Sequence, residues 1–141
     1  MKKVVLLFAV VLAVSCGSTK SADGKKPLYE VLTQKSSGGA QVKFFEIISE
    51  PKEFTMIKND PDLKDKIKAG DITTSNFLIL SAGEKSSGGY SIGIESVEET
   101  DKNIIVIVKE TAPEAGAMVT MGFTTPYCVV RINSKKDIVI K

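Results

Sequence analysis

The chain has 141 residues, which is enough for one domain with its own hydrophobic core. Its 19 basic and 17 acidic side chains nearly balance, and no basic stripe is interleaved with aromatic residues, so the composition disfavours nucleic-acid binding. The absence of histidine excludes Ser-His and Cys-His nucleophile pairs and zinc sites that contain histidine.

The first 26 residues have the pattern of a bacterial lipoprotein signal followed by a linker. Two lysines precede an apolar run that is too short to span a bilayer, and Ala13-Val14-Ser15 before Cys16 resembles a lipobox. We therefore predict a signal peptide over residues 1–15, lipidation of Cys16 by acyl chains such as palmitate, and a flexible tether over residues 16–26. The alternative is an ordinary signal peptide cut nearby, with the cysteine incidental.

Two strands are predicted at the start of the remaining domain, residues 27–141. They cover Leu28–Thr33 and Gln41–Ile48, and the Lys-Ser-Ser-Gly-Gly turn at 35–39 separates them. The second segment also fits a helix face, because Phe44, Phe45 and Ile48 are spaced for one. The Gly-Gly entry and the β-rich surroundings favour the strand.

One or two short helices are predicted next. Ser49 is in a position to cap the first, with Pro51 in its first turn. Asp60 and Pro61 have the pattern of a second helix start, and Gly70 is a suitable C-terminal end. Between them, Leu63 and Ile67 are four residues apart and so share one face of such a helix. Both helices are too short to be stable alone, so we expect them to cover a sheet edge or a barrel mouth.

The second half of the domain is predicted to consist of short strands separated by turn signals. The run Ile104–Val108 is apolar on both faces, which is typical of a central strand covered on both sides. The other predicted strands are Asn76–Ser81, Tyr90–Val97, Ala117–Phe123, Tyr127–Ile132 and Ile138–Lys141, with Ala82–Gly89 as a loop. The fold class is thus mainly β, bordering on α+β: an antiparallel β-sandwich or partly open barrel with the short helices inserted before the central strands.

Two groups of residues could support chemistry, and both favour a structural role. Cys128 lies on the same strand face as Val130 and Ile132, which indicates a small buried hydrophobe and not a reactive thiol. As it is the only cysteine outside the lipobox, no disulfide within the domain, metal site or cofactor is expected. Four acidic residues gather at a strand end and turn, where such charge is usually solvated: Glu95, Glu98, Glu99 and Asp101.

The segment Gly83-Glu84-Lys85-Ser86-Ser87-Gly88-Gly89-Tyr90-Ser91-Ile92 has a recognisable partner pattern further along the chain: Pro113, Thr125-Pro126-Tyr127 and Val129-Val130. With these residues, the chain resembles the C-terminal domain of the PrcB family over about residues 76–132. It departs from the family pattern at Ser87, where threonine is common, and at Gly122-Phe123-Thr124, where polar residues are frequent. The family consists of bacterial envelope lipoproteins named for a member that stabilises an exported protease complex. The resemblance implies binding to a protease or another exported protein, and no catalysis.

We therefore expect an exported, lipid-anchored and non-catalytic binding module in the bacterial cell envelope. A rigid sheet would present the Ser-Ser-Gly-Gly loop to an exported partner protein, with a tyrosine as anchor. The candidate contact residues are Glu84, Lys85, Ser86, Ser87, Gly88, Gly89, Tyr90 and Tyr127. A protease-inhibitor-like module and a structural envelope lipoprotein without a protease partner are the alternatives. The glycines could also simply form a bulge, and Tyr90 could fill the core.

Overall fold

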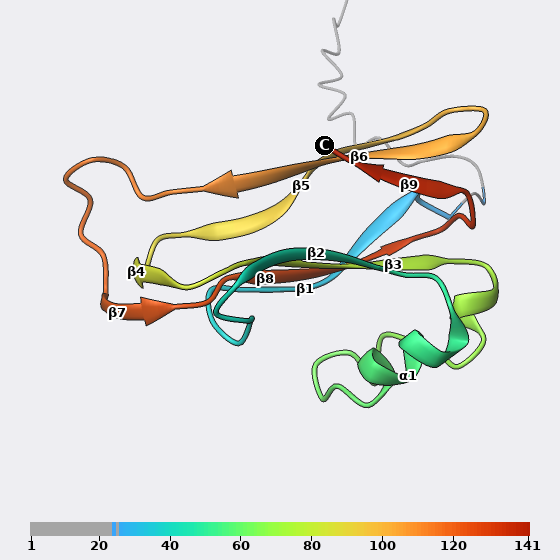
Figure 1. The fold of residues 1–141 in the computed structure, drawn as a ribbon, viewed down its shortest axis with the longest axis horizontal. Helices are drawn as coiled ribbons and strands as arrows, with labels where there is room; N and C mark the ends of the chain where they lie inside the picture. The colour runs from blue at the N-terminus through green and yellow to red at the C-terminus, as the bar shows by residue number, and fades with distance from the viewer. Residues whose placement is uncertain (1–23, 25) are drawn as a thin grey trace, which may run out of the picture.

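The computed structural model describes Gly24 and residues 26–141, and within this part the chain forms two β-sheets packed face to face (Figure 1). The predicted signal peptide, Cys16 and nearly all of the predicted tether lie outside the described residues. The four-stranded sheet has the order β1 (Tyr29–Lys35), β8 (Tyr127–Ile132), β3 (Asn76–Ala82), β2 (Lys43–Ile48), and every neighbouring pair is antiparallel. The three-stranded sheet has the order β5 (Ser91–Glu99), β6 (Asn103–Thr111), β9 (Asp137–Ile140).

A third, two-stranded sheet extends beyond these two. It pairs β4 (Lys85–Ser87) with β7 (Met121–Thr124) and lies at one end of the molecule, on the left in Figure 1. We give the name arm to residues 85–89, which are β4 and the two glycines after it, together with β7 and residues 112–120, which lead into β7. The expected loop is therefore wrong at 85–87, because these residues find a strand partner that lies more than thirty positions away in the sequence. The predicted strand at Ala117–Phe123 is shorter and later than expected, for the same reason.

The four-stranded sheet is covered on both faces, and β3 shows why. Leu78 and Leu80 face the three-stranded sheet, while Phe77 packs with the helical segment on the opposite face. The strand buried on both sides is thus β3, and the prediction of this environment for Ile104–Val108 is wrong. In β6, Ile104 is fully buried but Ile105 is only half-buried, because the helical layer covers the other sheet.

The helical layer begins at α1 (Pro51–Lys58), which buries Phe54 against Phe77 with ring centroids 5.0 Å apart. Its N-cap is Glu50 and not Ser49, and the Glu53 carboxylate accepts the backbone N–H groups of both at 3.2 Å. The second predicted helix is absent from the described residues: the segment after Asp60 forms isolated turns that bury Leu63 and Ile67. Gly70 precedes a single 3-10 turn, η1 (Asp71–Thr73), and so ends no helix.

The last strand departs from the prediction in direction. β9 runs parallel to β6, with Ile104 opposite Ile138 and Val106 opposite Ile140. The predicted fold class is nevertheless confirmed: the described chain is a mainly antiparallel β-sandwich with a short helix before its central strands, and its sheets do not close into a barrel. In the described part of the chain, the helices fall short of the length and apolarity that crossing a bilayer requires.

Candidate functional site

The predicted Ser-Ser-Gly-Gly segment forms the inner half of the arm. Gly88 donates its backbone N–H to the Thr120 carbonyl at 3.0 Å, and the Thr124 hydroxyl donates to the Ser87 carbonyl at 2.8 Å. Ser86 is exposed and Ser87 half-buried, so this strand keeps part of its surface open to solvent. The segment is therefore neither a free loop nor sealed inside the domain.

The two glycines let the arm close on itself. A Cβ at Gly88 would lie 2.2 Å from the Thr120 hydroxyl oxygen, far inside contact distance. Gly89 has a φ of +86°, and a Cβ there would lie 2.8 Å from the Cβ of Pro113. The glycines thus have the structural role that the sequence left open, and the Gly88 N–H is used within the chain.

Tyr90 lies at the root of the arm, where the chain enters β5. It is half-buried, and the Lys85 ammonium lies 5.6 Å from its ring centroid. Lys85 also approaches the Glu110 carboxylate at 3.8 Å, and the same carboxylate pairs with Lys43. Lys85, Tyr90 and Glu110 border a hollow of about 260 Å³, which makes Tyr90 a partly accessible aromatic in a charged setting.

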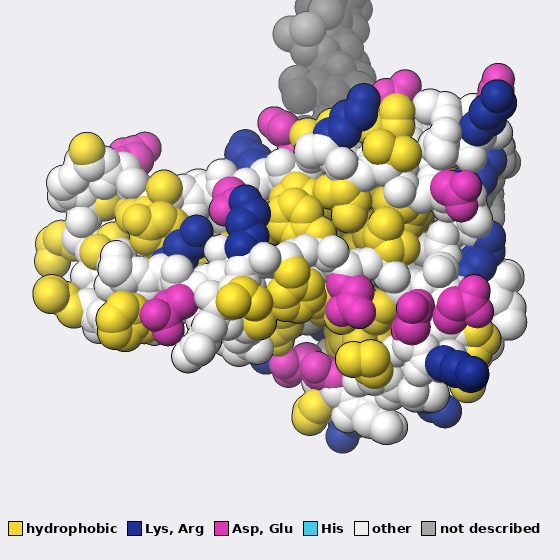
Figure 2. All heavy atoms as spheres, in the orientation of Figure 1, with side chains coloured by type: hydrophobic (Ala, Val, Ile, Leu, Met, Phe, Trp, Pro, Cys, Tyr) yellow, Lys and Arg dark blue, Asp and Glu magenta, His cyan; other side chains and the backbone are white. Residues whose placement is uncertain are grey.

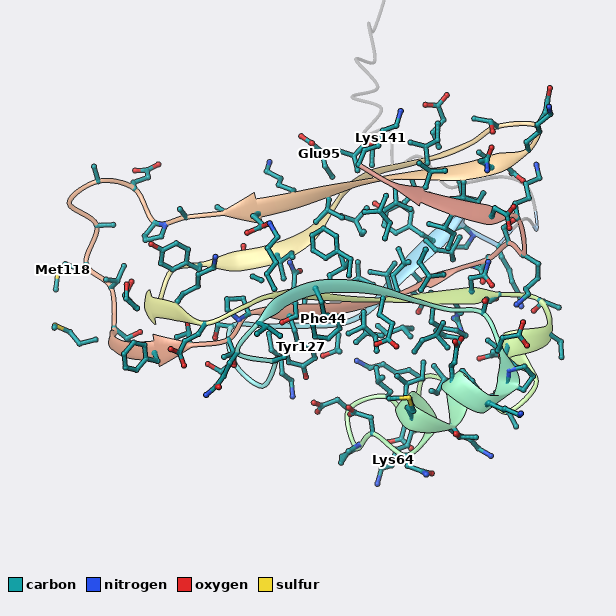
Figure 3. The ribbon with its side chains drawn as sticks, viewed as in Figure 1. Phe44, Lys64, Glu95, Met118, Tyr127 and Lys141 are labelled. Atoms are coloured by element: carbon teal, nitrogen blue, oxygen red, sulfur yellow. The ribbon has the colours of Figure 1, made fainter. Side chains whose placement is uncertain are left out.

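Tyr127 lies in a different part of the molecule from Tyr90, so the structure does not bring these two side chains together. It lies on the face of the four-stranded sheet that the helical layer covers (Figure 3), and its hydroxyl lies 3.3 Å from the Asp62 carboxylate, to which it donates. A Cβ at Gly38 would lie 3.0 Å from the Tyr127 ring, and a Cβ at Gly39 would lie 2.9 Å from the Tyr127 Cβ, so both glycines leave room for this side chain. Burial raises the pKa of Tyr127, whereas the hydrogen bond from Lys35 lowers the pKa of Asp62. Of the predicted contact residues, this is the one that the fold separates from the others.

The other half of the arm holds exposed apolar side chains, which lie in or next to the strand predicted at Ala117–Phe123. Met118 is fully exposed, Met121 is 96% exposed and Phe123 is 75% exposed. Figure 2 shows the resulting group of hydrophobic side chains over the arm, and Figure 3 shows Met118 projecting from its end. The periodicity of the sequence could not identify them, because the pattern of apolar residues along a strand is the same whether its apolar face is covered or exposed.

The groups considered for chemistry remain apart from this surface. Cys128 is fully buried, and burial raises the pKa of its thiol to about 11. Glu95 is exposed on β5, and Glu99 pairs with Lys136 at 2.9 Å. Within residues 26–141, no group of three or more acidic or cysteine side chains is placed to hold a metal ion.

Comparison with known proteins identifies one family. Residues 77–133 match the model described as PrcB C-terminal, which confirms the resemblance predicted from the sequence. The matched segment begins in β3 and ends just after β8, and so contains the whole arm and the strands from which it extends. No curated protein and no solved structure matches the chain.

Proposed function

Because residues 77–133 match the PrcB C-terminal model, we propose that this protein is a non-catalytic binding module whose arm attaches to an exported protease complex in the bacterial cell envelope. The observation that supports this function best is the group of bare apolar side chains at Met118, Met121 and Phe123. Contiguous apolar surface on a soluble domain is most often an interaction site, since it is costly to leave in water.

The arm is suited to protein contact for two further reasons. Methionine side chains are flexible and polarisable and fit irregular partner surfaces, while Phe123 provides a rigid aromatic anchor. The sandwich holds the base of the arm, because β4 follows β3 and β7 leads into β8, both in the four-stranded sheet. A rigid body with an apolar projection can stabilise a partner without performing any reaction on it.

The proposal includes attachment to a membrane through lipid on Cys16. Cleavage before this cysteine would leave residues 16–26 as a tether before β1. Several acyl chains, at about 0.8 kcal/mol per buried CH₂, would hold the protein at a membrane without a spanning helix. The supporting observation is the lipobox-like sequence at 13–16.

The test compares two exposed apolar sites in intact cells that produce the full-length protein. The arm variant replaces Met118, Met121 and Phe123 by serine, and the control replaces Met56, which is 68% exposed on α1. We expect the exported protease to co-purify with the wild type and with Met56→Ser, and to be lost from the arm variant. Equal recovery of the protease with all three proteins would contradict the proposal.

The same proteins separate stabilisation from inhibition. Adding purified wild-type protein to the protease should lengthen the time over which the protease stays active, without lowering its initial rate. A lower initial rate that the arm variant fails to produce would instead assign the inhibitor-like function. Neither effect, with no protease recovered from cells, would leave a structural lipoprotein without a protease partner.

A further inference from the structure

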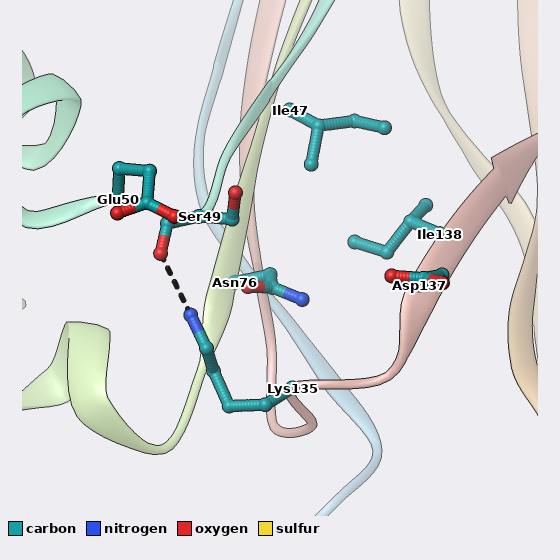
Figure 4. Close-up of a pocket in the computed structure, with 7 residues that line it drawn as sticks. All are labelled: Ile47, Ser49, Glu50, Asn76, Lys135, Asp137 and Ile138. Atoms are coloured by element: carbon teal, nitrogen blue, oxygen red, sulfur yellow. Dashed lines mark hydrogen bonds between the residues drawn. The ribbon is translucent and has the colours of Figure 1, made fainter.

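A cleft of about 590 Å³ lies between β2 and β9, which are edge strands of the two large sheets (Figure 4). It is at the opposite end of the molecule from the arm. Ile47 of β2 and Ile138 of β9 provide apolar walls, and Asn76 at the start of β3 lies at its centre. The volume is within the range of about 300–1,000 Å³ that is typical of ligand sites.

Asn76 contributes a buried acceptor without a partner. Its side chain belongs to a residue that is only 3% exposed, and its Nδ2 donates to the Lys136 carbonyl at 3.2 Å. That bond fixes the orientation of the amide, because the reverse orientation would place two carbonyl oxygens together. Its Oδ1 then receives no donor from any residue that the structure describes. This oxygen has less than 1 Å² of accessible surface, so it favours a cation in the cleft through its partial negative charge and not through direct contact.

The charges in the cleft favour a cation. Glu50 and Asp137 both line it, and neither has an ion-pair partner among residues 26–141. The single ammonium, that of Lys135, already donates to the Ser49 carbonyl at 2.8 Å (Figure 4). Two carboxylates therefore face one ammonium, and the cleft has an excess of negative charge.

We propose that this cleft receives a lysine side chain of a partner protein. The lysine methylenes would lie against Ile47 and Ile138, and its ammonium would lie near the carboxylates of Glu50 and Asp137. No other common side chain combines an apolar stem with a compact group of three donors. This proposal rests on the proposed function in one respect, namely that the ligand is part of a protein. It adds a second contact with that partner, away from the arm.

The test is a titration of the isotope-labelled full-length protein in detergent, followed by the NMR signals of the Asn76 side-chain amide. The probe is a capped pentapeptide with a central lysine, Ac-Gly-Ala-Lys-Ala-Gly-NH₂. Its matched control has norleucine in place of lysine, which keeps the apolar stem and removes the ammonium. We expect saturable shifts with the lysine peptide and at least tenfold weaker binding of the norleucine peptide.

Three variants test the electrostatic argument. Asp137→Asn should weaken binding of the lysine peptide about two- to fivefold, the range typical of partly exposed ion pairs. Lys135→Met should strengthen binding, because it removes the only positive charge in the cleft. Glu95→Gln, which changes an exposed carboxylate outside the cleft, should leave binding unchanged.

Several outcomes would overturn the inference. Equal binding of the norleucine peptide would make the cleft a purely apolar groove, and weaker binding by Lys135→Met would make its ligand an anion. Equal affinity for free butylammonium would assign a small amine in place of a protein side chain. Any of these results, together with loss of the protease from the arm variant, would remove the cleft proposal and leave the proposed function standing.

Discussion

At the scale of single residues, Gly88 is a glycine because a neighbouring side chain needs the space, and not because its backbone conformation requires one. Its φ lies outside the left-handed region, so the only obstacle to alanine is the Thr120 hydroxyl at 2.2 Å. We expect Gly88→Ala to destabilise the arm by about 1–3 kcal/mol, and Thr120→Ala in the same chain to restore most of the loss. The loss can be measured by hydrogen exchange of the backbone N–H at position 88, which donates to the Thr120 carbonyl.

Gly89 and Gly116 provide the controls for this cycle. Gly116→Ala, with φ at +80° and open space around it, should show the conformational cost alone, about 1 kcal/mol. Gly89→Ala combines that cost with the contact to Pro113 and should not recover with Thr120→Ala. If Thr120→Ala rescued Gly89→Ala but not Gly88→Ala, the geometry of the arm described above would be incorrect.

The Cys128 thiol should make the free energy of unfolding depend on pH in the alkaline range. Burial raises its folded pKa to about 11 from an ordinary value of 9.0. The unfolded chain therefore loses its proton first, so the stabilisation is complete below pH 9 and is lost as pH rises toward 11. We expect the free energy of unfolding to fall by up to about 3 kcal/mol over this interval, as measured by urea denaturation.

The control for this pH dependence is Cys128→Ala. This variant lacks the thiol but keeps Lys35 and Tyr127, whose pKa values are also raised, by the hydrogen bond to Asp62 and by burial respectively. Its stability should therefore decline less steeply with pH than that of the wild type. Parallel declines would show that the thiol does not contribute.

At the scale of elements, the start of α1 depends on a side chain inside the helix. Glu53 accepts the N–H groups of Ser49 and Glu50, so Glu53→Ala should lower the free energy of unfolding by about 1 kcal/mol. Ser49→Ala should change it by less than about 0.5 kcal/mol, because the Ser49 side chain caps nothing in the described structure. Thermal denaturation of both variants checks the pair, and a larger loss for Ser49→Ala would reinstate the serine cap.

The helical layer also shows why the second predicted helix failed. Leu63 and Ile67 have helical spacing and are both buried, as the pattern predicts, yet the segment forms only isolated turns. A segment this short gains little from its own hydrogen bonds, so packing on the four-stranded sheet decides its backbone. The sequence thus predicted which side chains are buried here, but not the regular structure between them.

At the scale of the whole molecule, the two cysteines should have opposite effects on membrane attachment. Cys16→Ser should move the protein from the detergent phase to the aqueous phase in detergent partition of bacterial lysates, because it removes the site of lipidation. Cys128→Ser should stay in the detergent phase, because this thiol is buried in the domain. A wild-type protein found in the aqueous phase would refute the proposed anchor.

Only part of the candidate site could be predicted from the sequence. The segment 84–90 and the resemblance to the PrcB C-terminal model follow from local sequence, since glycine turns and alternation are properties of neighbouring residues. The exposure of Met121 and Phe123 does not follow, because it depends on whether another element covers β7. Nor does the separation of Tyr127 from Tyr90, which the face of β8 and the docking of Asp62 determine.

The sequence by itself determined the β-rich class, the strand at Tyr127–Ile132 and the burial of Cys128, because alternation along one strand states which residues share a face. Only the tertiary structure decided which faces are covered. The parallel pairing of β9 with β6 joins segments about thirty residues apart, and the cleft that β9 forms with β2 joins segments about ninety residues apart. No local pattern specifies either meeting. Burial on both faces of β3 and bare apolar side chains on β7 are consequences of that long-range packing.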